Sequence, residues 1–286
     1  MKRQAPFAPS DKNGVRANER TATMPQYRLT QVDAFADRPF TGNPAAVVPL
    51  EHWLSDETLQ AIAMENNLSE TAFTIPGGGD ADYELRWFTP TTEVALCGHA
   101  TLASGHVLLG ERDRVRFRTR KAGVLEVARD GEALTLDLPE TLVEPGRDDA
   151  LLEALGTPDA EVFLSCKGAE ATAIVLLPDE DAVRACAPDM RRLGGIDLMA
   201  IVTAPASADY DVVSRVFVPA WGVDEDPVTG SAHAALAPFW CERLGRDAFT
   251  AFQASRRGGR VECRRVGERI LLGGRCVTVL EGMLRF

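Results

Sequence analysis

The chain has few of the residues that build metal centres or disulfide frameworks. It contains four histidines, none of them in an H-x-x-x-H arrangement, and six cysteines without a C-x-x-C pair. Zinc and iron sites draw their ligands from such clusters, so we expect no metal site. At 286 residues the chain is also too long to depend on disulfides. Its scattered cysteines are typical of a protein of the reducing cytoplasm.

Long apolar segments are missing as well. No run approaches the roughly 20 residues that span a bilayer, so we expect no membrane partner. The first 23 residues are polar and lack the apolar core of a secretory signal. We therefore expect a cytoplasmic protein and treat residues 1–24 as a flexible polar tail outside the folded part.

An excess of basic residues is also absent. The formal net charge is −11, from 42 acidic and 31 basic residues, which argues against a nucleic-acid partner unless a local basic patch exists. The densest basic run, 112–121, has arginines at alternate positions. This spacing is typical of the solvated face of a β-sheet. We expect no nucleic-acid binding.

Short strands dominate the part of the chain after residue 24. In the first half the patterns predict strands over 27–35, 45–50, 68–75 and 83–89, a helix capped by Ser55 or Asp56, and a buried helix from Gly98 to Leu109. In the second half they predict strands over 161–166, 171–177, 197–204 and 209–218, a helix after Asp179 and another from Gly230 to about Leu244. So many strands with so few helices favour an antiparallel sheet and the α+β class.

Turn signals divide the chain. Asp130-Gly131 and Gly273-Gly274 each predict a tight hairpin. Prolines, a glycine and acidic residues over 139–149 predict a link between domains. We expect an N-terminal domain over 25–140, to which a final strand, 277–286, returns, and a C-terminal domain over 150–276.

Two segments resemble each other. In one, F-T-P at 88–90 leads through Glu93 to CGHATLA; in the other, F-V-P at 217–219 leads through acidic residues to TGSAHAALA. If the similarity is not a coincidence, two like halves each direct a helix that begins at a glycine, Gly98 or Gly230, toward a shared cleft. Paired helix N-termini attract an anion such as a carboxylate. Alternatively, the glycines only permit tight turns and close packing.

Four polar residues are candidates for chemistry. His99 lies in the first turn of its expected helix, where the dipole disfavours imidazolium, although a structural role is the alternative. Asp226 and Ser231 flank the second helix start, where either could be a cap. Glu70 stands in the largely apolar LSETAF, and burial there would raise the pKa of its carboxyl group. Residue chemistry alone does not choose Glu70 over Glu65, Glu93 or Asp226, and His106 and His233 are interpreted as structural.

Four blocks in the same order resemble the PhzF-like family of phenazine-biosynthesis isomerases. They are QVDAFADRPFTGNPAAVV, NNLSETAF, FTPTTEVALCGHATLASG and DEDPVTGSAHAAL, between residues 31 and 236. The resemblance implies the diaminopimelate epimerase-like fold, with two pseudo-symmetric domains, each a mainly antiparallel sheet around a central helix. It also implies a homodimer and a cofactor-independent isomerase that shifts a proton on a small carboxylate-bearing metabolite, as on a dihydro-hydroxyanthranilate in the phenazine pathway.

The resemblance also assigns roles to residues. Glu70 matches the glutamate that carries the proton, and His99, Asp226 and Ser231 match the other polar site residues. The backbone of Gly98 and Gly230 matches the carboxylate-binding positions.

One departure concerns thiols. Related epimerases and racemases use two cysteines, one on each side of the carbon. Cys97 matches the first position, but Thr229 stands at the second, and its hydroxyl is far too weak an acid to replace a thiol. This disfavours the alternative of a cysteine-dependent amino-acid epimerase or racemase. A binding or interaction protein that keeps the fold without turnover is a further alternative.

Overall fold

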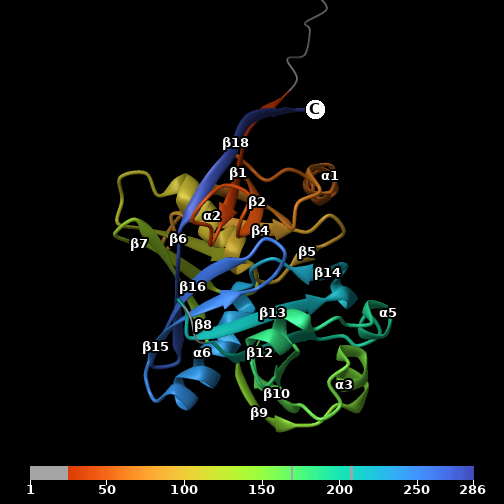
Figure 1. Ribbon diagram of the computed structural model, residues 1–286. Helices are drawn as coiled ribbons and strands as arrows, with labels where there is room; N and C mark the ends of the chain where they lie inside the picture. The colour runs from red at the N-terminus through yellow and green to blue at the C-terminus, as the bar shows by residue number, and fades with distance from the viewer. Residues whose placement is uncertain (1–24, 169, 207–208) are drawn as a thin grey trace, which may run out of the picture.

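Two strand-rich halves of the same topology make up the protein (Figure 1). The computed structural model describes residues 25–168, 170–206 and 209–286, so the polar tail predicted over 1–24 lies outside the described residues. In chain order the first half consists of β1 (Gln26–Ala34), β2 (Asn43–Pro49), α1 (Asp56–Asn66), β3 (Glu70–Pro76), β4 (Tyr83–Phe88), β5 (Glu93–Val94), α2 (Gly98–Leu108), β6 (Arg114–Thr119), β7 (Val124–Asp130) and β8 (Ala133–Pro139).

The second half follows without interruption. Its elements are β9 (Leu142–Gly146), α3 (Asp149–Leu155), β10 (Glu161–Lys167), β11 (Thr172–Leu176), α4 (Glu180–Ala185), α5 (Met190–Leu193), β12 (Met199–Pro205), β13 (Val212–Val218), the 3-10 turn η1 (Pro219–Trp221), β14 (Val223–Asp226), α6 (Gly230–Leu244), β15 (Ala248–Gln253), β16 (Gly259–Val266), β17 (Arg269–Gly274) and β18 (Cys276–Arg285). No helix in the described ranges combines the length and apolar character needed to cross a membrane.

The strand pairings repeat from one half to the other. In the first half β2 and β3 are parallel, β3 and β4 antiparallel, and β4 and β6 parallel, followed by the antiparallel run β6-β7-β8. Strands β11, β12, β13, β15, β16 and β17 are paired in the same directions in the second half. The halves join where β8 pairs with β17. The internal similarity and the α+β class predicted from the sequence are therefore confirmed.

Each half wraps its strands around one central helix, α2 or α6. Every residue from Gly98 to Gly105 in α2 is buried, as is every residue from Ala232 to Cys241 in α6. A helix surrounded on all sides has no solvated face, which explains the small and apolar residues of both segments. Their predicted starts at Gly98 and Gly230 are correct.

Local signals placed several other elements correctly. Ser55 caps α1, since its hydroxyl accepts a hydrogen bond from Thr58 N, and Asn67 ends the helix in the left-handed region at φ 48°. Strand β6 alternates exposed arginines with buried side chains, so the basic run is the solvated face of a sheet, as predicted.

The two glycines of RILLGG do not form the predicted hairpin. Strand β17 ends at Gly274 and pairs with β16 and β8, and the turn between β16 and β17 lies at Gly267, with φ +60°. A Cβ on Gly274 would lie 2.4 Å from the Phe35 ring. The glycine is therefore needed for close packing, which a two-residue turn signal does not distinguish.

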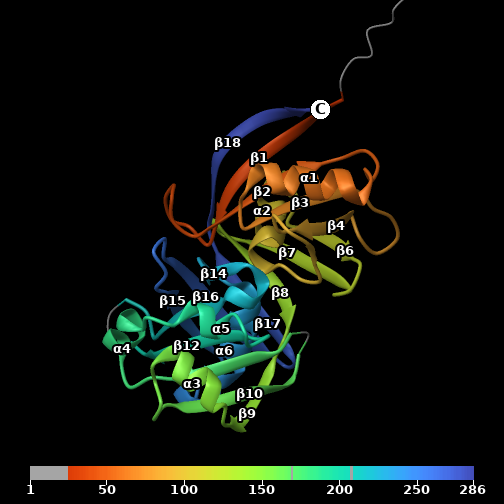
Figure 2. The same ribbon diagram turned by 90° about the vertical axis from the view of Figure 1, so that its right-hand side faces the viewer.

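The stretch over 139–149 is also more ordered than the predicted link, because it contains β9, which pairs with β10. Strand β18 crosses to the first half and pairs antiparallel with β1, from Gln26 opposite Arg285 to Ala34 opposite Cys276. Figure 2 shows the two strands as long separate ribbons, red and blue, that extend beyond the first half and lie close together near the C-terminus. These pairings agree with domains over 25–140 and 150–276, and the division itself stays a prediction.

Candidate active site

The N-termini of α2 and α6 meet at Gly98 and Gly230. A Cβ built on either glycine would lie 2.9 Å from the Cα of the other, so this approach requires the absence of a side chain. Neither N-cap residue, Cys97 or Thr229, caps its helix with a side-chain hydrogen bond. Two positive helix ends thus lie side by side, an arrangement suited to an anion.

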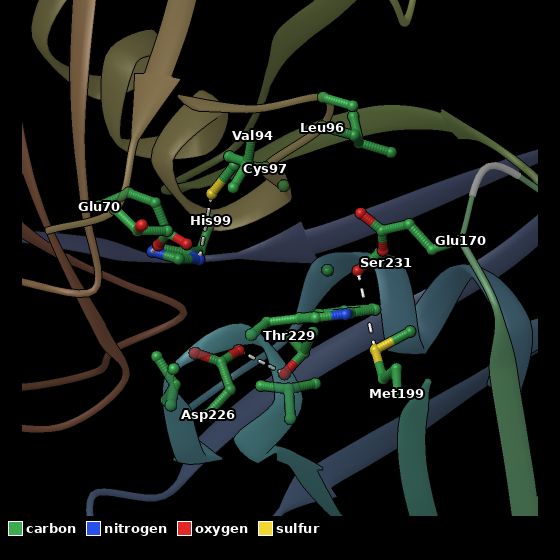
Figure 3. A pocket seen from close by; sticks show the side chains of 18 of the residues that line it. Glu70, Val94, Leu96, Cys97, His99, Glu170, Met199, Asp226, Thr229 and Ser231 are labelled. Carbon is green, nitrogen blue, oxygen red and sulfur yellow. Dashed lines mark hydrogen bonds and ion pairs between the residues drawn. The ribbon is translucent and has the colours of Figure 1, made fainter. Parts of the chain in front are cut away.

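A cavity of about 600 Å³ opens at this junction (Figure 3). It is lined by residues of both halves: Glu70, Thr89, Thr91, Thr92, Val94, Ala95, Leu96, Cys97, Gly98 and His99 from the first, and Glu170, Met199, Val218, Ala220, Trp221, Gly222, Val223, Asp226, Thr229, Gly230 and Ser231 from the second. All six residues predicted for the site line it. Within the described part of the chain its lining holds three carboxylates, one imidazole and no lysine or arginine.

Glu70 and His99 face each other at one side of the cavity (Figure 3). Glu70 is the first residue of β3 and His99 the second of α2. His99 Nε2 lies 2.9 Å from Glu70 Oε2, and the side chains are 4% and 16% exposed. The contact lacks the alignment of a hydrogen bond, and neither atom has another partner among the described residues. Both atoms are buried, and within the described residues neither is engaged in a hydrogen bond.

The charges around His99 oppose the effect of its helix. Burial lowers the pKa of His99, but the carboxylates of Glu70 and Asp226 raise it, and the net shift is upward. This upward shift is opposite to the effect expected from the helix dipole alone, because the two carboxylates outweigh burial. Burial, together with the nearby charge of Glu70, also raises the pKa of Asp226, while His99 lowers it. The sequence does not reveal that the fold brings these groups together.

Asp226 and Ser231 approach the cavity from the second half. Asp226 Oδ2 accepts a hydrogen bond from Thr229 Oγ1. The Thr229 hydroxyl therefore bonds to a carboxylate instead of capping the N-terminus of α6. The Ser231 hydroxyl lies 4.0 Å from Met199 Sδ (Figure 3). The geometry places both residues as predicted, and their roles in the reaction stay predictions.

Sequence reasoning missed two residues of the site. Asn43 lies within the first of the four blocks but was not named as a site residue, and its buried amide contacts His99 and Asp226. Glu170 follows β10 in a segment without a motif, and it lines the cavity near Ser231. The pKa of Glu170 is raised by burial, although the nearby Ser231 hydroxyl opposes this. No local pattern marks either residue as part of the site.

The cluster of Glu70, Cys97 and His99 has potential metal-ligand atoms within 4.8 Å of one another. Cys97 and Glu70 lie at opposite nitrogens of the His99 ring: Cys97 Sγ is 3.5 Å from Nδ1, whereas Glu70 lies beside Nε2. Burial, followed by the charge of Glu70, raises the pKa of the Cys97 thiol well above its usual value, which disfavours a thiolate ligand. The arrangement of Glu70, Cys97 and His99 therefore suits proton transfer better than the binding of one metal ion by all three residues.

Structure at the helix junction leads to a first prediction. Gly98→Ala should destabilise the protein by about 1–3 kcal/mol, because the methyl group must displace the backbone of Gly230. The measurement is the urea midpoint. Gly78→Ala is the control, since nothing lies within 4 Å of a Cβ there and its φ is not positive. Equal midpoints for the two variants would show that the junction can relax.

Buried His233 leads to a second prediction. Burial lowers its pKa to about 4, and the hydrogen bond with Thr229 O only partly opposes this. The unfolded chain binds this proton near pH 6.5, so the free energy of unfolding should fall between pH 6.5 and 4, by about 3 kcal/mol. His233→Gln should remove this part of the pH dependence, measured by urea unfolding at pH 7 and pH 4. The exposed His52→Gln should keep it, and the same slope in both variants would contradict the assignment.

Comparisons with known proteins match nearly the whole folded part. A family model described as phenazine biosynthesis-like protein (PhzC-PhzF) matches residues 32–282. An uncharacterized isomerase of Pseudomonas aeruginosa is 50% identical, with 90% of this chain and 98% of the relative covered. The human phenazine biosynthesis-like domain-containing protein is 35% identical, over 88% of this chain and 96% of the relative.

Solved structures agree with these matches. A PhzF-family protein of Enterococcus faecalis has a TM-score of 0.83 and 41% identity, and the match covers 92% of this chain and all of the other. A hydroxyproline epimerase of Agrobacterium vitis, at 14% identity and a TM-score of 0.61, shares the fold alone, over 91% and 92% of the two chains. The predicted diaminopimelate epimerase-like fold is thereby confirmed.

Proposed function

Because the chain belongs to the phenazine biosynthesis-like (PhzC-PhzF) family, we propose that it is a cofactor-independent isomerase that shifts a proton on a small carboxylate-bearing metabolite. Relatives named as isomerases support the reaction class. The observation that carries the mechanism is the junction of two helix N-termini beside a glutamate–histidine pair. It combines a place for an anion with an acid–base group in one cavity.

In the proposed mechanism the substrate carboxylate binds at the N-termini of α2 and α6. The backbone N–H groups of Gly98 and Gly230 and the Ser231 hydroxyl line the cavity there and donate hydrogen bonds to this carboxylate. This fixes the rest of the molecule relative to Glu70. The Glu70 carboxylate takes a proton from one carbon and returns it to another. His99 lies against the same carboxylate and orients it through the 2.9 Å contact.

One carboxyl group acting twice fits this site better than a pair of thiols. Cys97 is fully buried against the first helix start, and its raised pKa leaves it a thiol at neutral pH. Thr229 donates its hydroxyl hydrogen to Asp226 and has no acid–base capacity of its own. Cys97 and Thr229 therefore do not provide the pair of acid–base groups, one on each side of the substrate carbon, that racemisation needs.

Removal of the Cys97 thiol is a prediction that separates the two mechanisms. Cys97→Ala should keep turnover within several-fold of the parent, since the thiol contributes packing and no proton. A cysteine-dependent racemase would lose about 10²-fold or more. Initial rates of the two proteins measure the difference, and alanine at Cys276, a cysteine outside the cavity, is the matched control.

The proposal is tested by proton exchange. The full chain is incubated in ²H₂O with a dihydro-hydroxyanthranilate, then with a panel of other small carboxylates, and carbon-bound protons are followed by ¹H NMR. We expect at least one compound to be isomerised with movement of a single proton. Absence of isomerisation and exchange over the whole panel would favour the metabolite-binding alternative.

The proposal further includes a homodimer, as the family resemblance implies, and a cytoplasmic location, which the scattered cysteines favour. Light scattering coupled to gel filtration measures the mass in solution. A mass of one chain, 31.0 kDa, at micromolar concentration would contradict the dimer.

A further inference from the structure

A single buried amide connects the two halves of the site. Asn43 is fully buried at the start of β2. Its Nδ2 lies 3.1 Å from His99 Nδ1, 2.9 Å from Asp226 Oδ1 and 2.9 Å from the Val228 carbonyl oxygen. These acceptors belong to α2, to β14 and to the segment before α6. No function has been given to Asn43 so far, although it touches two of the four polar site residues.

We propose that Asn43 is a positioning residue that donates a hydrogen bond to His99 Nδ1 and thereby holds His99 as the Nε2–H tautomer, with its proton on the nitrogen that lies beside Glu70. In a neutral imidazole one nitrogen is a donor and the other an acceptor. A donor placed at Nδ1 makes this nitrogen the acceptor. The ring proton then lies on Nε2, beside Glu70 Oε2.

The orientation of the Asn43 amide follows from its surroundings. If the amide were turned over, Oδ1 would face the Asp226 carboxylate and the Val228 carbonyl, which are both acceptors. Two such contacts between oxygen atoms are repulsive, whereas Nδ2 is a donor toward both groups. Its two hydrogens serve three acceptors, Asp226, Val228 and His99 Nδ1, so one hydrogen is shared between two of them. In the present orientation Oδ1 is a buried atom without a hydrogen-bond partner among the described residues. The cost of this unpaired oxygen indicates that the contacts of Nδ2 decide the orientation.

The charges that face His99 act against the amide. Glu70 on β3 and Asp226 on β14 favour a second ring proton, and the buried Cys97 thiol stands 3.5 Å from Nδ1. A proton on Nδ1 would point at the Asn43 N–H₂ group, donor against donor. Asn43 therefore opposes protonation at Nδ1 while leaving Nε2 free to serve Glu70 and the substrate.

The backbone of Asn43 is held by the other half of the molecule. Gly42 N donates to Gly258 O at 2.7 Å, and Arg257 Nε donates to Gly42 O at 2.8 Å. The loop between β15 and β16 thus fixes the residue that precedes Asn43. An amide anchored in this way can set the ring of His99 with little freedom.

The tautomer can be measured without a substrate. In the ¹⁵N-labelled full chain, long-range ¹H–¹⁵N NMR spectra distinguish protonated from unprotonated ring nitrogens, and His99→Gln assigns the His99 signals among the four histidines. We expect the neutral ring to carry its proton on Nε2. Asn43→Asp replaces the donor by an acceptor of the same shape, so it should place a proton on Nδ1 and raise the pKa of His99 by about one unit or more. The same exchange at the exposed C-cap, Asn67→Asp, is the control and should change neither.

Two results would overturn the inference. One is a parent protein whose neutral His99 carries its proton on Nδ1, a measurement that needs no variant to fold. The other is an Asn43→Asp spectrum in which the His99 ring nitrogens match those of Asn67→Asp. The tautomer of His99 is measured without turnover. Only the role of this tautomer in catalysis by Glu70 rests on the proposed isomerase function. Failure of the proton-exchange test would therefore leave this result readable by itself.

Discussion

Glu70→Gln is expected to lower turnover by about 10²–10⁴-fold, the usual contribution of a general acid–base group. Glutamine has the shape of glutamate and can still contact His99, but it cannot accept a proton from carbon. The side chain is 16% exposed at the edge of the cavity, so the fold should tolerate the change. Initial rates measure the loss, and binding of the same carboxylate compound by calorimetry should stay within a few-fold, since the helix starts hold its anionic group.

Glu65→Gln serves as the matched control, because Glu65 is an exposed glutamate in α1 outside the cavity. Its turnover should equal that of the parent. The charge of Glu70 raises the pKa of His99, so this pKa should fall in Glu70→Gln and stay unchanged in Glu65→Gln. Undiminished turnover in Glu70→Gln would sink the proton-carrier role and leave Asp226 as the carboxylate to examine.

Arg257→Ala is expected to destabilise the protein by about 3–5 kcal/mol, as when one partner of a buried ion pair is removed. Arg257 Nη2 lies 2.8 Å from Asp33 Oδ1, and Asp33 is 1% exposed. Its guanidinium also donates to the carbonyl oxygens of Gly42 and Thr41. Without it, the Asp33 carboxylate keeps one described hydrogen bond, from Phe40 N at 2.7 Å, so a buried charge is left almost uncompensated.

The free energy of unfolding in urea measures this effect, with Arg256→Ala as the control because Arg256 is the exposed neighbour. Arg257→Ala should also slow turnover, since the segment that it holds carries Asn43. Adding Asp33→Asn to Arg257→Ala should recover part of the stability by removing the orphaned charge. If Arg257→Ala unfolds at the same urea concentration as Arg256→Ala, the pair does not stabilise the junction of the halves.

Much of the fold could be predicted because its signals are local. Ser55 and Asn67 mark the two ends of α1 through a side-chain cap and a left-handed backbone conformation. The likeness of the two helix starts also has a structural counterpart in the loops that lead to them. Arg86 and Arg215 each form a two-bonded ion pair, with Glu93 and Glu225.

These pairs explain the acids noticed in the sequence. Arg86 and Arg215 each stack over a phenylalanine of the same strand, Phe88 or Phe217, at 4.9 Å. Glu93 is therefore a structural residue that fastens a cavity loop, and its pKa is lowered chiefly by Arg86. The sequence offered Glu93 as a possible acid–base group because it does not show which carboxylates have arginine partners.

The remainder of the site depends on contacts between residues far apart in the chain. Asn43 meets Asp226 across 183 positions, and no local pattern reports such a pairing. Gly273-Gly274 misled for the same reason, because the Phe35 ring that needs the space comes from the other half. Glu70 was chosen through the family motif and not through its own chemistry, which the sequence shares among several acids.

The crossing of β18 has a consequence for the order in which the protein is made. Strand β1 is translated well before β18 (Cys276–Arg285), which is one of its two antiparallel neighbours. At about 5–20 residues per second, the first half waits about 7–30 seconds for this strand. The second half, which contains β9 to β17, has its own strands together before then. During synthesis the first half therefore exposes the edge of β1, and chaperones that shield strand edges should act on that half.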